Sequence, residues 1–148
     1  KRNETYDQLC ELYNRIQETP PKISIMSTTA AELVKLAVNC FLTTKISYAN
    51  MVGQVMALSG MEDEIPTVLG AIGDDSRIGR KYLNFGFGFG GPCLPRDNRA
   101  FAACAKQLGL DYNLGETTDN FNEEHAHFIK DHLGFLIRNS IFLYILYL

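Results

Sequence analysis

The sequence predicts a mainly α-helical fold, and three observations support this. Apolar residues recur every three or four positions in most segments that glycine or proline bounds, which is the period of an amphipathic helix. The alternating, β-branched pattern of a strand occurs in one short run, residues 22–26, and this strand has no expected partner. The 148 residues are 46% apolar and 21% charged, a balance that supports a buried core rather than disorder.

The helix boundaries follow from capping and breaking residues. Thr28 or Thr29 can cap the longest helix, and Gly60 ends it. Pro20 stops the first helix and Gly109 stops the fourth. The expected helices cover residues 3–18, about 30–59, 63–72, 97–108 and 117 or 118 to 132.

The longest helix combines an apolar surface with one polar stripe. Its apolar residues nearly encircle it, so we expect it to be buried on most sides. Glu32, Lys35, Asn39 and Thr43 recur at helical spacing and share one face. An ammonium and an amide one turn apart suit the stabilisation of an oxyanion. The alternative is an ion pair between Glu32 and Lys35 on a solvated strip.

A glycine-rich loop covers residues 82–95. Residues 86–91 match the GxGxxG pattern of dinucleotide-binding proteins, but no convincing strand precedes them, and Pro92 and Pro95 delay the next helix. We therefore reject that interpretation. The missing side chains instead predict a loop whose backbone N–H groups approach a hydrogen-bonding ligand. The alternative is a turn that only packs tightly.

Cys93 differs in position from the other three cysteines. Cys10, Cys40 and Cys104 fall within helical patterns, where cysteine is commonly a small buried hydrophobe. Cys93 lies in the loop, just before a predicted helix and near Arg96, and both features favour the thiolate. It is a candidate nucleophile, although many loop cysteines have no special reactivity.

Composition excludes several classes of partner. The net charge is −3 and no Lys/Arg-rich run occurs, so nucleic acid is not an expected partner. The histidines are expected to be exposed on a helix without forming a metal site. Residues 133–148 are apolar but too short and interrupted to span a membrane, so we expect them to pack on protein or form a disordered or added end, with membrane contact as the alternative. No export signal opens the chain, which predicts a cytoplasmic protein with reduced thiols.

Four separated motifs occur in a recognisable order. They are residues 31–50, Arg77-Ile78-Gly79, residues 88–97 and Asn122-Glu123. Together they resemble the central portion of the UDP-glucose/GDP-mannose dehydrogenase family over about residues 28–133. The resemblance is specific because several motifs agree in both order and spacing.

The resemblance implies an oxidation of the C6 alcohol of a nucleotide sugar to a carboxylate, with NAD⁺ used twice. Cys93 matches the family's nucleophile, which forms a thiohemiacetal and then a thioester. Lys35 matches the lysine that stabilises oxyanion charge, with Asn39 beside it on the same face. Asp97 matches the carboxylate that places or activates water.

The resemblance also implies binding residues and a partner. The nucleotide-sugar site would include Lys35, Asn39, Arg77, Tyr82, Leu83, Asn84, Phe85, Gly86 and Gly90, with Arg77 reaching into the neighbouring subunit's site. Cys93 and Arg96 would lie near NAD, and the long helix would form a homodimer interface. Two residues depart from the family pattern: Pro92 replaces a usual serine, and Arg96 replaces a usual lysine.

The expected organisation has three parts. Residues 1–27 are a helix and strand remnant of a Rossmann-type dinucleotide-binding domain, residues 28–133 the central dehydrogenase and dimerisation domain, and residues 134–148 a tail of unclear role. We expect the family's dinucleotide-binding and C-terminal domains to lie outside this sequence, so the isolated chain should be inactive. The alternative function is a non-catalytic helical dimerisation module, and the sequence does not identify the sugar.

Overall fold

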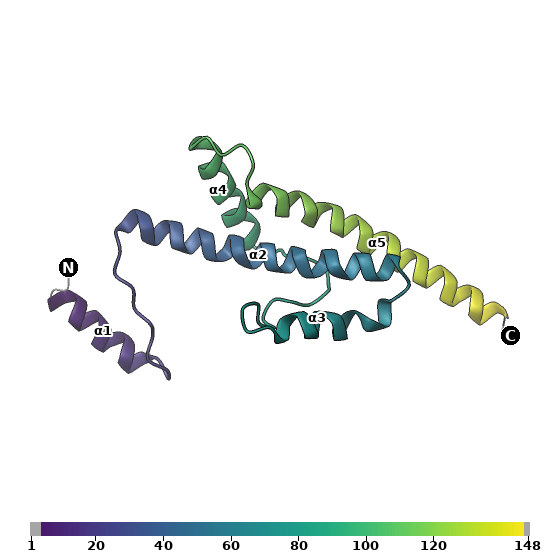
Figure 1. The fold of residues 1–148 in the computed structure, drawn as a ribbon, viewed down its shortest axis with the longest axis horizontal. Coiled ribbons are helices and arrows are strands. Elements are labelled where there is room, and N and C mark those ends of the chain that lie inside the picture. Colours follow the sequence, from purple (N-terminus) through teal and green to yellow (C-terminus); the bar gives the residue numbers. More distant parts are fainter. Residues whose placement is uncertain (1–3, 147–148) are drawn as a thin grey trace. The chain divides into compact units, whose positions relative to one another are not determined.

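The computed structural model describes residues 4–146, with side chains described for residues 4–134. Within residues 4–146 the structure has five α-helices, one 3₁₀ helix and no strand, so the mainly α prediction is confirmed (Figure 1). The elements are α1 (Glu4–Ile16), α2 (Thr28–Leu58), η1 (Glu62–Glu64), α3 (Ile65–Asp74), α4 (Leu94–Gln107) and α5 (Leu114–Leu146).

The strand predicted at residues 22–26 is wrong. These residues are irregular and mostly exposed. A strand needs a neighbour to pair its N–H and C=O groups, and the described part of the chain offers none. No strand remnant of a Rossmann-type domain is therefore formed here.

The chain divides into two compact units, residues 1–33 and 34–148. The first unit contains α1, the irregular segment and the first turn of α2. The helix predicted at residues 3–18 forms as α1, where Arg15 pairs with Glu11 and no residue is buried. Ser27 Oγ accepts a hydrogen bond from the Ala30 N–H (3.2 Å), so Ser27 caps α2 rather than the predicted Thr28 or Thr29.

Gly60 ends α2 as predicted, through the paired hydrogen bonds of a Schellman motif. Its φ is +74°, its N–H donates to Ala57 O (3.1 Å), and the Met61 N–H donates to Met56 O (2.9 Å). Glycine adopts this left-handed conformation without a Cβ clash.

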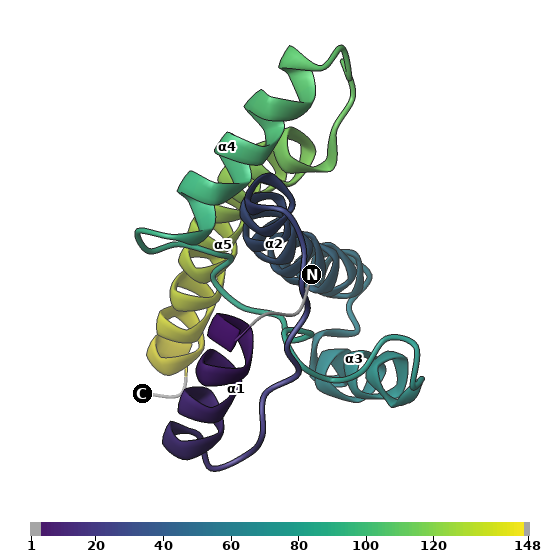
Figure 2. The ribbon, with the colours of Figure 1, turned by 90° about the vertical axis from the view of Figure 1, so that its left-hand side faces the viewer.

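The prediction that α2 is buried on most sides is wrong. Its buried residues are Cys40, Thr43, Ser47, Ala49, Asn50, Gly53 and Met56. Within the second unit α2 runs between α3 and α5 (Figures 1 and 2). Its large apolar side chains that stay exposed in this unit are Val34, Val38, Phe41, Tyr48, Met51, Val55 and Leu58. These apolar side chains are therefore surface, not core, in the single chain.

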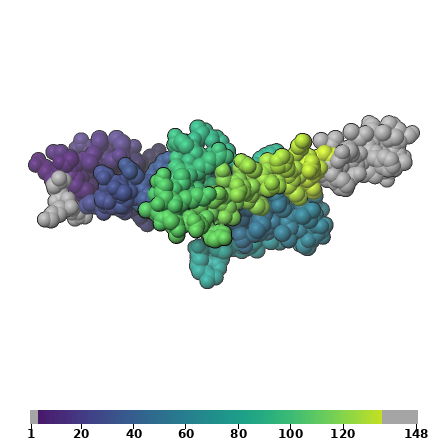
Figure 3. Space-filling view, turned by 90° about the horizontal axis from the view of Figure 1, so that it is seen from above, coloured from purple at the N-terminus to yellow at the C-terminus, as the bar shows by residue number. Residues whose placement is uncertain are grey.

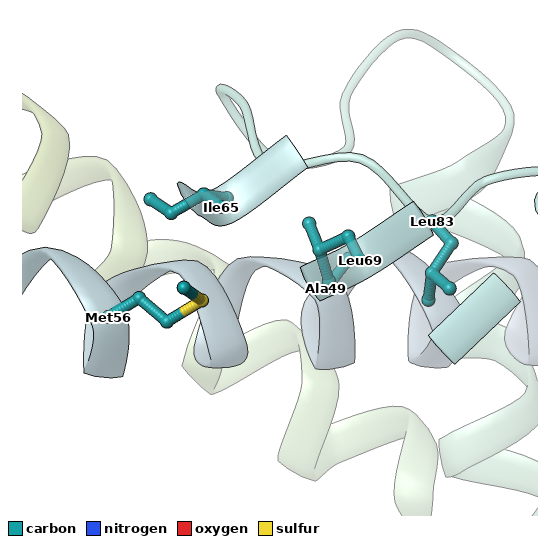
Figure 4. Close-up of a cluster of buried hydrophobic side chains, with 5 residues drawn as sticks. All are labelled: Ala49, Met56, Ile65, Leu69 and Leu83. Atoms are coloured by element: carbon teal, nitrogen blue, oxygen red, sulfur yellow. The ribbon is translucent and has the colours of Figure 1, made fainter. Parts of the chain in front are cut away.

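One hydrophobic cluster joins α2, α3 and the loop that follows. It consists of Ala49, Met56, Ile65, Leu69 and Leu83 (Figure 4). Phe85 packs beside it, with its ring against the backbone of Gly53, where an added Cβ would overlap the ring. The helix predicted at residues 63–72 is therefore present, two residues later than expected and after one turn of 3₁₀ helix.

α4 and α5 pack against each other, and seen from above they lie over part of α2 (Figure 3). α4 contacts α2 through Asn98 and Thr43, and α5 contacts it through His125 and Gln54.

α4 begins three residues before the predicted start, with Pro95 in its first turn, and the predicted stop at Gly109 (φ +85°) is confirmed. α5 begins at Leu114 because Asn113 Oδ1 accepts from the Glu116 N–H (2.8 Å), so Asn113 acts as the cap in place of Thr117 or Thr118. The backbone of α5 continues through Leu146, so the predicted end at residue 132 is wrong. The side-chain packing expected for the tail lies outside the described side chains.

No helix in the described part of the chain combines the length and apolar character that a membrane crossing requires.

Candidate active site

The site is organised around two consecutive side chains in the first turn of α4. Asp97 and Asn98 are 2% and 0% exposed. The Asp97 carboxylate accepts hydrogen bonds from Lys35 Nζ, Asn39 Nδ2 (2.6 Å) and Arg96 Nε (3.1 Å). Because the Lys35 hydrogen bond is the largest effect, it holds the pKa of the Asp97 carboxyl below its usual value, although burial acts in the opposite direction. Asp97 is therefore an anion at neutral pH.

The polar stripe of α2 contacts α4 through Lys35, Asn39 and Thr43, and is partly exposed to solvent. The side chain of Lys35 is 53% exposed, whereas Asn39 is half-buried. Both face Asp97, one turn after Cys93, whose carbonyl accepts from the Asp97 N–H (2.9 Å). The ion pair of Lys35 is thus made across two helices, not with Glu32 within the stripe.

Asn98 connects three helices. Its Oδ1 accepts from Thr43 Oγ1 of α2 (2.9 Å), and its Nδ2 donates to Gly115 O (2.6 Å) and Thr118 Oγ1 (3.2 Å) of α5. Because the backbone carbonyl can only accept, the amide orientation is fixed. α4 is held by buried polar contacts to α2 on one side and α5 on the other.

Cys93 lies at the N-cap of α4 and is exposed. The other cysteines lie within helices, as predicted, but only Cys40 is buried, and burial raises the pKa of its thiol. Cys10 and Cys104 are half-buried. The described geometry therefore presents Cys93 to solvent at a helix N-terminus, an environment that suits a nucleophile.

The glycine-rich loop is held by side chains from α2 and α5. The Gly86 N–H donates to Asn50 Oδ1 (2.9 Å), and Gly86 O contacts His125 Nε2 (2.5 Å). The Phe89 N–H donates to Asn122 Oδ1 (2.8 Å), and Asn122 Nδ2 donates to Phe89 O (3.0 Å). Some of the backbone groups that were expected to bind a ligand are therefore already paired within the chain.

The described residues do not form a dinucleotide-binding fold. Residues 86–91 follow a loop rather than a strand, and Pro92 and Cys93 separate the motif's last glycine, Gly91, from the start of α4. The GxGxxG fingerprint needs a strand before it and a helix directly after it. Arg96, predicted to lie near NAD, is exposed and pairs with Asp97.

The predicted substrate residues differ in how accessible they are. Arg77 is exposed and pairs with Asp75 in the turn after α3, which raises the pKa of the guanidinium. The side chain of Leu83 belongs to the core cluster and is not available to a ligand. Tyr82 is exposed and has a φ of +62°, a strained conformation for tyrosine. Of the others, Asn84 and Gly90 are exposed, and Phe85 and Gly86 are half-buried.

No role was predicted from the sequence for four positions that organise the site, Asn50, Asn98, Asn122 and His125, although Asn50 and Asn122 fall within its motifs. The three asparagines are polar residues within apolar helical patterns, a signal that could have marked them as buried hydrogen-bonding groups.

The prediction that the histidines are exposed is wrong for His125. His125 is 0% exposed, and its Nδ1 contacts Gln54 Nε2 (2.7 Å). His132 is half-buried and contacts Glu62 (2.8 Å). His127 alone of the three is exposed.

The lowered pKa of Asp97 predicts a pH dependence of stability. Its contribution is complete above the unfolded-state pKa of about 4 and is lost as pH falls through the lower folded-state pKa. The Asp97→Asn variant should have a smaller free energy of unfolding than wild type at pH 7, and the difference should shrink below about pH 4. Urea unfolding at several pH values measures this. Asp111→Asn, at an exposed position, is the control, and an unchanged difference at low pH would contradict the assignment.

Comparison with known proteins shows which family this chain resembles. The model of the "UDP-glucose/GDP-mannose dehydrogenase family, central domain" matches residues 29–124. The chain is 40% identical over 104 residues to UDP-glucose 6-dehydrogenase TuaD of Bacillus subtilis, covering 70% of this chain and 22% of that protein. It is 33% identical over 132 residues to UDP-glucose 6-dehydrogenase of Pseudomonas aeruginosa, covering 89% and 29%.

A solved structure of the same family also matches this chain. The UDP-glucose dehydrogenase of Pyrobaculum islandicum matches with a TM-score of 0.71 and 38% identity, over 82% of this chain and 27% of that one. The chain thus spans between 22% and 29% of the length of these relatives. It belongs to the UDP-glucose/GDP-mannose dehydrogenase family and corresponds to the family's central domain.

Proposed function

We propose that this chain supplies the thiol part of the active site of an NAD-dependent nucleotide-sugar 6-dehydrogenase. One observation carries the proposal: Cys93 is exposed at the N-terminus of α4, one turn before an anionic Asp97 that binds Lys35 and Asn39. This combination supports a nucleophile that works beside donors for an oxyanion. The relatives named UDP-glucose 6-dehydrogenase favour UDP-glucose as the sugar nucleotide.

Cys93 acts on the aldehyde stage of the reaction. Its thiolate adds to the C6 carbonyl carbon, and the carbonyl oxygen becomes the oxyanion of a thiohemiacetal. Lys35 has three N–H donors and gives one to Asp97, so donors remain for that oxyanion. After oxidation to the thioester, water attacks the carbonyl carbon, the C–S bond breaks, and the acid and the Cys93 thiol are released.

Asp97 orients donors more than it accepts protons. A carboxyl whose pKa is lowered is a weak general base near neutral pH. Its contacts instead fix Lys35 and Asn39 on the side of α4 that carries Cys93. Asp97 thus places the oxyanion donors and adds a negative charge that can orient the attacking water.

Cys93 and Arg96 remain proposed to lie near NAD, but residues 4–146 do not form a fold that binds the dinucleotide. NAD supplies hydride acceptance, which the alcohol and thiohemiacetal oxidations both need. Residues 4–146 contain no strand and so no dinucleotide-binding fold. The isolated chain is accordingly proposed to be inactive, although it carries the thiol.

Thiol reactivity tests this proposal. At about pH 6.5, where an ordinary thiol is mostly protonated, iodoacetamide should modify Cys93 at least about tenfold faster than a free cysteine derivative. Mass spectrometry of peptide digests separates Cys93 from Cys10, Cys40 and Cys104. Comparison with the free thiol matters because exposure alone makes Cys93 faster than the other three. A rate equal to that of the free thiol would contradict an activated nucleophile.

We also propose that the chain forms a homodimer through α2, and one observation favours this. Val34, Phe41, Tyr48 and Val55 are exposed and recur every seven residues, and exposed Met51 and Leu58 fall three residues after two of them. This is the spacing of an apolar seam between two packed helices. The seam would also serve the alternative function, a non-catalytic dimerisation module, which has no use for an activated Cys93.

A charge in the seam tests the dimer. Phe41→Glu places a carboxylate on a side chain that is 66% exposed in the single chain, and should weaken self-association at least about tenfold. Leu108→Glu is the matched control, because Leu108 is 77% exposed but lies after α4. Sedimentation equilibrium measures both. A monomeric wild-type chain, or equal weakening by both variants, would contradict the seam.

A further inference from the structure

His125 occupies a position that the proposed mechanism does not use. It is fully buried, and its ring stacks with Phe121 and Phe128 at centroid distances of 5.9 and 6.2 Å. The ring of Phe85 meets it edge-on at 5.8 Å. A phenylalanine would satisfy this apolar setting, so the choice of histidine needs a reason in its two nitrogen atoms.

Both ring nitrogens have partners, and these partners define the tautomer. Gly86 O can only accept, so His125 Nε2 carries the proton and donates to it (2.5 Å). The other nitrogen, Nδ1, then accepts from the side-chain amide of Gln54 (2.7 Å). His125 therefore links α2, through Gln54, to the backbone of the glycine-rich loop.

Two asparagines complete the attachment of this loop. Asn50 of α2 accepts from the Gly86 N–H, so both polar groups of Gly86 are held from opposite helices. Asn122, one turn before His125 on α5, pairs with both the N–H and the C=O of Phe89. Gly88 lies against Asn122, and an added Cβ would overlap its Oδ1.

Between the two fixed residues of the attached segment, Gly86 and Phe89, lie one exposed and one half-buried residue. Phe87 is exposed, and Gly88 has a φ of +91°, a conformation that glycine adopts readily. Cys93 follows Phe89 by four residues. A segment fixed at both ends loses little conformational entropy when a ligand binds to it, because the ordering has already been done in folding.

We propose that His125, in its Nε2–H tautomer and together with Asn50 and Asn122, is a positioning residue that holds residues 86–89 in the conformation that receives the nucleotide sugar. The identity of the ligand rests on the proposed function. The attachment itself is a property of the free chain and can be measured without a ligand.

Three variants separate hydrogen bonding from packing. His125→Phe keeps the ring stack and removes both hydrogen bonds. His125→Gln can restore both, with its amide N–H donating to Gly86 O and its Oε1 accepting from Gln54. His127→Phe is the matched control, since His127 is exposed two residues along α5.

Amide hydrogen exchange, followed by NMR, reads the state of the loop. In His125→Phe, exchange at Gly86 and Phe89 should be at least about tenfold faster than in wild type, with smaller changes in α2 and α5. His125→Gln should return the loop rates to within about threefold of wild type, and His127→Phe should change nothing. Unchanged loop rates in His125→Phe, equal acceleration in loop and helices, or no rescue by glutamine would each overturn the proposal.

A second measurement covers the case in which His125→Phe does not fold. The ¹⁵N chemical shifts of the wild-type imidazole distinguish the two tautomers, and the proposal requires Nε2–H. An Nδ1–H tautomer would overturn it. Failure of the proposed function is seen separately: a Cys93 no more reactive than a free thiol contradicts the mechanism and leaves the loop exchange rates as they are.

Discussion

The fold of the second unit depends on the need to satisfy two buried polar side chains, Asp97 and Asn98. They are consecutive, so they point to different neighbours around the first turn of α4, and both are almost fully buried. A buried carboxylate or amide without partners costs several kcal/mol, on the order of the stability of a small domain. Partners on α2 and α5 meet this requirement only if α4 has one position and one rotation about its axis.

That constraint determines where the candidate nucleophile lies. Cys93 caps α4, so whatever fixes the helix also fixes the thiol. The same α2 that binds Asp97 through Asn39 binds the loop through Asn50, eleven residues further along. α2 therefore contacts both the helix that carries Cys93 and the glycine-rich loop, and so fixes their positions relative to each other.

The sequence predicted the helices well and the burial poorly. Breakers and caps are local, so the ends at Gly60 and Gly109 could be found, and so could the helical face that holds Lys35 and Asn39. Burial depends on neighbours that periodicity does not identify. The apolar residues of α2 therefore predicted a core helix where one face is exposed, and His125 was taken for a surface residue although the rings of Phe121 and Phe128 enclose it.

The most direct test of this account is the energetic coupling between Thr43 and Asn98, which join α2 to α4 through a hydrogen bond of 2.9 Å. Thr43→Val and Asn98→Ala, singly and together, would be compared by their free energies of unfolding in urea. If buried polar contacts dock α4, the double variant should be less destabilised than the sum of the single variants by about 1 kcal/mol or more. Additivity within about 0.3 kcal/mol would contradict it and would leave apolar packing as what positions the helix.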